Sequence, residues 1–197
     1  MSSAQAYPGS CHCGFVQYQI RLKFPPIHDR NAESVRLYKC NCSTCQKMGF
    51  FHCRPISPKE DFILISPTNI GELGDYRVFS KNNGWYFCKK CGVRVFGMAG
   101  VWEQAEVSVD EWASANLGVG QDTTQVLKTK PMIRTLEAEG QVETKRYHYL
   151  SVNAVTLEPS EDTDLRMWHE KGWVMYMDCR DRSGPPRLEK PYYGGMY

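Results

Sequence analysis

The chain has 197 residues, with 24 lysines and arginines against 22 aspartates and glutamates, so its formal net charge is only +2. This length predicts a single domain with room for a hydrophobic core. Because a nucleic-acid partner requires a strongly basic surface, the near-neutral charge argues against one. The sequence contains no signal-peptide pattern and no apolar run of the roughly 20 residues that a membrane-spanning helix needs, so we expect a cytoplasmic protein without a membrane partner.

Short runs of β-branched and aromatic residues follow one another along the chain, after a loose lead-in at 1–9. Strands are expected, in chain order, over 15–22, 35–38, 50–54, 62–65, 76–79, 85–87, 93–96, 146–155 and 173–177. Asn83-Gly84 predicts a hairpin between two of them. Only 162–171 has a helical pattern, ended by Gly172, whereas 110–130 is polar and expected at the surface. The sequence therefore predicts a mainly β fold with one short helix and an irregular C-terminal tail.

The nine cysteines are the most unusual feature of the composition. Seven of them lie in three short turns, which hold Cys11 and Cys13, then Cys40, Cys42 and Cys45, then Cys88 and Cys91. Because the chain carries no secretion signal, such clusters are typical of metal sites rather than of disulfides. Thiolates two or three residues apart can face one ion at a Zn–S distance of about 2.3 Å, and Gly14 and Gly92 allow a tight backbone turn beside them.

Ligand counting divides these cysteines into a group of four and a group of three, which predicts two Zn²⁺ ions per chain. The simplest partition joins Cys11, Cys13, Cys88 and Cys91 in a closed site of the kind that is usually structural. Cys40, Cys42 and Cys45 then hold a second ion with an open fourth position, which is the arrangement of catalytic zinc. In an alternative arrangement Cys53 or His52 closes this second site, because both lie only a short strand away.

Three ordered motifs make the pattern more specific. They are Gly9-Ser10-Cys11-His12-Cys13-Gly14, Cys40-Asn41-Cys42-Ser43-Thr44-Cys45-Gln46-Lys47-Met48-Gly49 and Phe87-Cys88-Lys89-Lys90-Cys91-Gly92. With them the chain resembles the glutathione-dependent formaldehyde-activating enzyme family, which also includes centromere-protein-V-like proteins. The resemblance is strongest over 9–97 and implies an Mss4-like fold of twisted β-sheets pinned by zinc, within one domain spanning 1–197. The stretches 102–145 and 162–197 match no family motif, and we expect them to be a variable insertion and a variable C-terminal segment.

The resemblance also implies a role for each cluster. It implies a structural zinc at Cys11, Cys13, Cys88 and Cys91, a catalytic-type zinc at Cys40, Cys42 and Cys45, and formation of S-hydroxymethylglutathione. A zinc ion held by three thiolates favours a further sulfur ligand. We therefore hypothesise a zinc-dependent carbon–sulfur lyase or synthase that acts on a thiol adduct, with glutathione as the thiol and an aldehyde or other electrophile as its partner.

Other residues near the motifs are weaker candidates. The family motif reaches Lys47, which we take as a further catalytic candidate, and Arg36, Arg54 and Arg94 could also pair with the carboxylates of glutathione. We expect His52 to face solvent, His12 to point away from the metal and Cys179 to be buried as a small apolar side chain. Two other functions remain open: a non-catalytic, zinc-stabilised binding module and a redox or metal-buffering protein.

Overall fold

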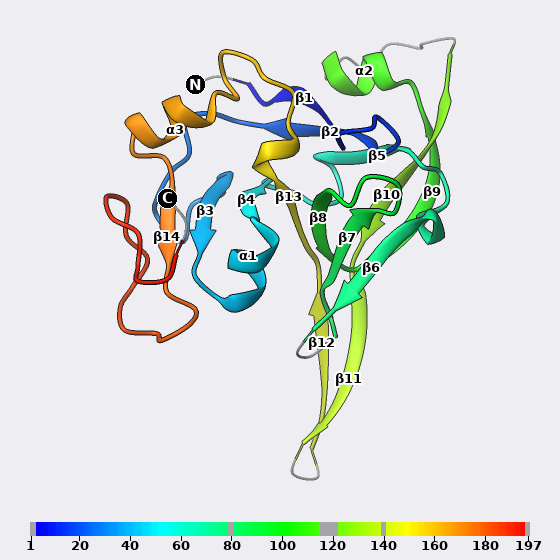
Figure 1. Cartoon of the computed structure of the whole chain (residues 1–197). Coiled ribbons are helices and arrows are strands. Elements are labelled where there is room, and N and C mark those ends of the chain that lie inside the picture. Colours follow the sequence, from blue (N-terminus) through cyan, green and yellow to red (C-terminus); the bar gives the residue numbers. More distant parts are fainter. Residues whose placement is uncertain (1–2, 79–80, 115–121, 139–140, 196–197) are drawn as a thin grey trace.

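The structure is a computed structural model that describes residues 3–78, 81–114, 122–138 and 141–195 (Figure 1). Strands account for most of its regular structure, so the predicted mainly β fold is confirmed. They form two large sheets and one separate two-stranded hairpin. A single hydrophobic cluster joins the large sheets, since it contains Tyr18 and Phe62 from one sheet and Phe96 and Val152 from the other.

The first large sheet has five strands and begins at the N-terminus. Its spatial order is β1 (Gln5–Ser10), β2 (Gln17–Leu22), β5 (Phe62–Ser66), β10 (Thr124–Lys130) and β9 (Val101–Val107). In β2 the side chains of Tyr18, Ile20 and Leu22 are buried and their neighbours are more exposed, which is the alternation expected of a strand with one face on the core. The expected loose lead-in is wrong, because β1 pairs with β2 along its whole length as an edge strand that tolerates Pro8.

The second large sheet has seven strands and carries most of the candidate site. Its spatial order is β14 (Met175–Met177), β3 (Arg36–Cys40), β4 (Phe51–Arg54), β13 (Tyr149–Asn153), β8 (Arg94–Ala99), β7 (Gly84–Cys88) and β6 (Leu73–Arg77). The hairpin predicted at Asn83-Gly84 is confirmed, since β6 and β7 pair antiparallel from Arg77 and Gly84 onward. β14 runs parallel to its neighbour, β3, whereas the other strand pairs among the described residues of this sheet are antiparallel.

The expectation that 110–130 lies at the surface is wrong for its second half, and residues 115–121 of this stretch lie outside those that the structure describes. In the second half, β10 pairs with β9 and β5, and Val126, Leu127 and Thr129 are buried. The side chains of this strand are mostly polar, so its place in the sheet comes from tertiary pairing rather than from local pattern. The chain then forms the hairpin of β11 (Met132–Ala138) and β12 (Gln141–Tyr147), which projects away from both large sheets (Figure 1).

The described residues contain three short α-helices, where the sequence predicted one. The predicted helix is found as α3 (Leu165–Glu170), and the others are α1 (Ser43–Met48) and α2 (Val109–Ser114). Two single 3₁₀ turns, η1 (Ile70–Glu72) and η2 (Ala154–Thr156), complete the elements. Each α-helix has six residues, which is too short for a helical repeat of apolar residues to show in the sequence. No helix among the described residues has the length and apolar character needed to span a bilayer.

Candidate metal centres and active site

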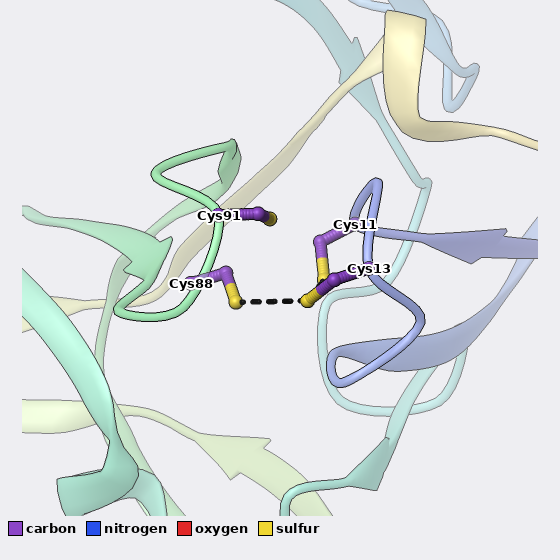
Figure 2. A group of neighbouring side chains, drawn as sticks. All are labelled: Cys11, Cys13, Cys88 and Cys91. Carbon is purple, nitrogen blue, oxygen red and sulfur yellow. Dashed lines mark hydrogen bonds between the residues drawn. The ribbon is translucent and has the colours of Figure 1, made fainter.

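The first cysteine cluster lies between the two large sheets. Cys11 and Cys13 come from the turn after β1, and Cys88 and Cys91 come from the turn between β7 and β8; Figure 2 shows the two turns facing each other with their sulfurs inward. Their four sulfurs all lie within 4.8 Å of one another. The Cys11–Cys13 and Cys13–Cys88 sulfur–sulfur distances are 3.6 Å and 3.7 Å.

These distances fit a tetrahedral zinc ion. Four sulfurs at about 2.3 Å from a central ion are separated from one another by about 3.8 Å. The cluster is compact enough to hold such an ion with all four positions taken by protein. A metal here would join the five-stranded sheet to the seven-stranded sheet, as a structural site does.

The two turns of this cluster share the same backbone design. The amide of Cys11 donates to the carbonyl of Val16, and the amide of Cys88 donates to the carbonyl of Val93, both at 3.0 Å. The glycine that follows each pair lies in the left-handed region, with φ of +74° at Gly14 and +77° at Gly92. A residue with a Cβ would be strained at either position, so the glycines account for the recurring Cys-Gly order.

The second cluster lies where β3 runs into α1. Cys40 ends β3, Cys42 caps the helix and Cys45 lies inside it, and their three sulfurs are within 4.8 Å of one another. The Cys42 sulfur accepts a hydrogen bond from the Cys45 amide, and the Cys40 sulfur accepts one from the Cys42 amide, both at 3.4 Å. Main-chain donors that already point at the sulfurs favour their thiolate form, which is the form that binds metal.

Because the three thiols lie close together, their pKa values differ from one another. Hydrogen bonds from Cys40 and Cys45 lower the pKa of Cys42 to about 2, whereas hydrogen bonding to Cys40 and Cys42 raises the pKa of Cys45. The three sulfurs therefore titrate as one coupled group rather than independently. Three soft donors in this arrangement suit a zinc ion.

Neither Cys53 nor His52 completes this set of mutually close donors among the described residues. The Cys53 thiol is fully buried in the main hydrophobic core. The Nε2 atom of His52 lies 3.2 Å from the Cys45 sulfur but is not within 4.8 Å of all three sulfurs. The geometry therefore shows a group of three sulfurs with His52 as their neighbour.

A cavity of about 670 Å³ opens beside the second cluster, and both Cys40 and Cys45 line it. Its other lining residues are His28, Arg30, Arg36, Tyr38, His52, Arg54, Trp85, Tyr149, Met175, Met177, Cys179, Pro185, Pro186 and Leu188. The described residues around it include three arginines and no acidic side chain. A cavity with this charge favours an anionic ligand, and its volume suits a small-molecule substrate.

His52 is a buried residue at the floor of this cavity, so the expectation that it faces solvent is wrong. Its ring stacks on Tyr38 with centroids 4.2 Å apart, and its Nδ1 atom lies 3.0 Å from the Ser151 hydroxyl and 3.1 Å from the Tyr149 hydroxyl. Burial lowers the pKa of His52 to about 3. The imidazole is therefore neutral near pH 7 and holds the Cys45 sulfur through a hydrogen bond.

A chain of hydroxyl groups leads from His52 along the cavity. The hydroxyls of Tyr38 and Tyr149 are 2.9 Å apart, and burial raises the pKa of both, so both are neutral hydrogen-bonding groups. The guanidinium of Arg54 lies over the Tyr149 ring, 4.7 Å from its centroid. No ion pair is found for Arg54 within the described part of the chain, which leaves its charge available to a ligand.

The other cationic side chains that the sequence suggested as partners for glutathione do not all lie at the cavity. Arg36 lines the cavity, but its guanidinium donates to four main-chain carbonyls of the loop that carries Arg30, so it holds that loop in place. Lys47 is exposed on α1 and Arg94 lies 4.2 Å from the Phe87 ring centroid, and neither lines the cavity. His12 is exposed and outside its neighbouring cluster, as expected.

The C-terminal segment, residues 178–195, contributes a wall that sequence reasoning missed. Cys179 is exposed and lines the cavity, so the expectation that it is buried is wrong. The segment is attached to the second cluster by Asn41, whose side chain accepts from the amides of Cys179 and Arg180 at 2.8 Å and 3.0 Å. Asn41 also donates to Asp178 at 2.7 Å. Its position between two cluster cysteines was visible in the sequence, but its distant partners were not.

The chain matches one family of known proteins over much of its length. The model of the family described as glutathione-dependent formaldehyde-activating enzyme matches residues 6–131, which is more than half of the chain and includes all the cysteines of both clusters. The chain is also similar to a Rhodobacter sphaeroides protein of known crystal structure, with 18% identity, a TM-score of 0.41 and coverage of 80% of this chain and 94% of that one. The family match shows that this chain belongs to the glutathione-dependent formaldehyde-activating enzyme family.

Proposed function

We propose that the chain is a zinc-dependent carbon–sulfur lyase or synthase that acts on the adduct of a thiol, glutathione, with an aldehyde. One observation carries this proposal: Cys40 and Cys45 of the three-sulfur cluster line a cavity whose charged side chains, among the described residues, are all cationic. Three protein ligands leave room for an exchangeable fourth. Family membership supports glutathione as the thiol.

In the proposed reaction, the thiol adds to the aldehyde carbon. The C–S bond forms, the carbonyl π bond opens onto oxygen, and the proton of the thiol ends on that oxygen; the lyase direction reverses each change. When bound at Cys40, Cys42 and Cys45, a zinc ion supplies a soft Lewis-acid site that favours the thiolate form of a sulfur ligand. The cluster and the cavity therefore bring the two reaction partners to the same place.

The residues of the cavity have separate tasks in this proposal. Arg30 and Arg54 bind the two carboxylates of glutathione, since charge-assisted hydrogen bonds from arginine suit that group. The hydroxyl pair of Tyr38 and Tyr149 donates a hydrogen bond to the aldehyde oxygen, where negative charge develops as the C–S bond forms. His52, held by Ser151 and Tyr149, keeps the Cys45 sulfur oriented.

The test compares the native chain with Cys45→Ala. Exchange between formaldehyde with glutathione and their adduct is followed by two-dimensional NMR exchange spectroscopy, with circular dichroism as the check on folding. We expect the native chain to accelerate exchange, and Cys45→Ala to remain folded and lose at least about 10²-fold of that rate, because the metal site has lost one of its three protein ligands. Ile133→Ala, at an exposed side chain outside the cavity, is the control and keeps its rate. Equal rates in the native chain and Cys45→Ala would contradict the proposal and favour a binding module.

A further inference from the structure

The register of β14, β3 and β4 orders the floor of the cavity from one end to the other. Cys40 pairs with Met177, Tyr38 pairs with Met175 and His52, and Arg36 pairs with Arg54. At about 3.3 Å per residue, the step from Cys40 to Arg36 along β3 is about 13 Å. The floor therefore runs from the cluster sulfurs, through the tyrosine and histidine, to the arginines.

Apolar side chains flank the end of the cavity that holds the sulfurs. Met175 and Met177 of β14 lie beside Tyr38 and Cys40 in the register. The C-terminal segment adds Pro185, Pro186 and Leu188 to the same cavity, and Trp85 of β7 also lines it. None of these side chains offers an ionic partner, so this part of the cavity suits an uncharged, apolar group.

The C-terminal wall is held in place by a defined set of hydrogen bonds. The main chains of Tyr176 and Arg187 bond to each other in both directions, at 2.7 Å and 3.2 Å, which fixes the part of the segment next to Leu188. Asp178 accepts from the amide and hydroxyl of Ser183 at 2.7 Å and 2.6 Å. With Asn41 bound to Asp178, the wall is tied directly to the loop that carries the second cluster.

This wall comes from a part of the chain that the family match does not reach. The match ends at residue 131, whereas the methionines of β14 and the whole 178–195 segment lie beyond it. The cluster cysteines, Tyr38, His52 and the arginines thus belong to the matched part of the chain, whereas Tyr149, Ser151 and the apolar surface beside the sulfurs lie beyond it.

We infer that this cavity takes glutathione adducts of bulky apolar aldehydes, with an arylalkyl or branched alkyl group on the adduct carbon. The inference rests on the proposed function and specifies its substrate. The carboxylates lie at the arginine end, the sulfur lies beside Cys40, and the apolar substituent contacts Met175, Met177 and Leu188. Cleavage breaks the C–S bond, passes the hydroxyl proton to sulfur and forms the aldehyde carbonyl, so no further reactant is needed. A hydroxymethyl group is too small to contact this wall.

Binding of stable thioethers tests the inference without turnover. Calorimetry compares S-methylglutathione with S-benzylglutathione on the full-length, zinc-loaded chain. We expect S-benzylglutathione to bind at least about tenfold more tightly, because its benzyl group buries additional apolar surface. Leu188→Ala should weaken S-benzylglutathione binding by about threefold to tenfold and change S-methylglutathione binding by less than about twofold. Leu188→Gln, which keeps the size of the side chain, should have the same selective effect.

The control is Ile133→Ala, which truncates an apolar side chain that is 70% exposed on the projecting hairpin and should leave both affinities unchanged. Equal binding of the two thioethers, or an equal loss of both in the Leu188 variants, overturns the inference and leaves the proposed function standing. Binding of neither thioether to the folded, zinc-loaded chain overturns the inference, and if glutathione itself also fails to bind, the proposed function is overturned as well.

Discussion

The Nε2 atom of His52 lies 3.2 Å from the sulfur of Cys45, and the opposite ring nitrogen faces the hydroxyls of Ser151 and Tyr149. The imidazole therefore connects a cluster cysteine to the polar floor of the cavity. Its burial keeps it neutral, because a charged ring would lose solvation that these contacts do not replace.

Acid should destabilise the native chain more than a His52→Gln variant. Burial lowers the pKa of His52 to about 3 in the folded state, and the unfolded value is about 6.5. Between these values the unfolded state binds more protons, so the stability associated with His52 is complete above about pH 6.5 and is lost as the pH falls toward 3. From pH 7.5 to 5.5 the extra loss is about 1.4 kcal/mol.

Urea unfolding of both proteins at the two pH values measures this difference. Protonation of the cluster thiolates also weakens zinc binding, so metal analysis must show the same zinc content in both proteins at the two pH values before the difference is assigned to the histidine. The same decrease in the free energy of unfolding for the native chain and the variant would show that His52 is not buried in its neutral form.

Removing the Tyr149 hydroxyl should slow the reaction without weakening substrate binding. Tyr149→Phe keeps the ring beneath Arg54 but breaks the hydrogen bonds to Tyr38 and to Nδ1 of His52. We expect kcat for adduct exchange to fall by about 10- to 100-fold, with KM changed less than about twofold, because this donor acts on charge that develops in the transition state. Tyr76→Phe, on an exposed side chain outside the cavity, is the control. A rise in KM with unchanged kcat would instead place Tyr149 in ground-state binding.

Arg54 should determine affinity for the thiol. In Arg54→Gln the cavity loses a cation that has no ion pair among the described residues, and one carboxylate of glutathione loses its partner. We expect KM for glutathione to rise by about 10- to 100-fold, the range of a charge-assisted hydrogen bond, and the effect of salt on KM to diminish. Arg94→Gln makes the same substitution outside the cavity and should leave KM unchanged. Identical KM values for native chain and Arg54→Gln would exclude this residue from the thiol site.

The first cluster should govern stability rather than rate. Cys88 is fully buried and belongs to the four sulfurs between the two large sheets. Cys88→Ala should lose one zinc per chain and several kcal/mol of stability, because binding at a closed site is coupled to folding. Metal analysis and thermal unfolding check both effects, and Cys179→Ala is the control at an exposed cysteine. A Cys88→Ala protein that keeps its melting temperature would show that this cluster does not stabilise the fold.

Local signals explain what the sequence predicted well. The cysteine turns are visible because their ligands lie within a few residues and are followed by Gly14 and Gly92, whose positive φ the turn requires. Alternating apolar residues predicted strands such as β2, and Asn83-Gly84 predicted the hairpin of β6 and β7. In each case the residues that determine the local structure lie within one short stretch of chain.

Features that depend on distant contacts were missed. His52 was expected to face solvent as a strand histidine, whereas in the structure the rings of Tyr38, Phe50 and Trp85 pack against it. Asn41 and Asp178 are 137 residues apart, so the sequence around Asn41 did not indicate that its side chain binds the C-terminal wall of the cavity. The polar strand β10 is likewise held in its sheet by β9 and β5 rather than by its own composition.

X-ray absorption at the zinc edge tests the central claim most directly, that Cys40, Cys42 and Cys45 hold a zinc ion whose fourth position accepts the sulfur of the substrate. The native chain should contain two zinc ions with an average of about 3.5 sulfur ligands each, from four sulfurs in one cluster and three in the other. Addition of glutathione should raise this average to about 4, and S-methylglutathione, which cannot form a thiolate, should leave it lower. A sulfur count that glutathione does not change, or a single zinc ion per chain, would contradict the account.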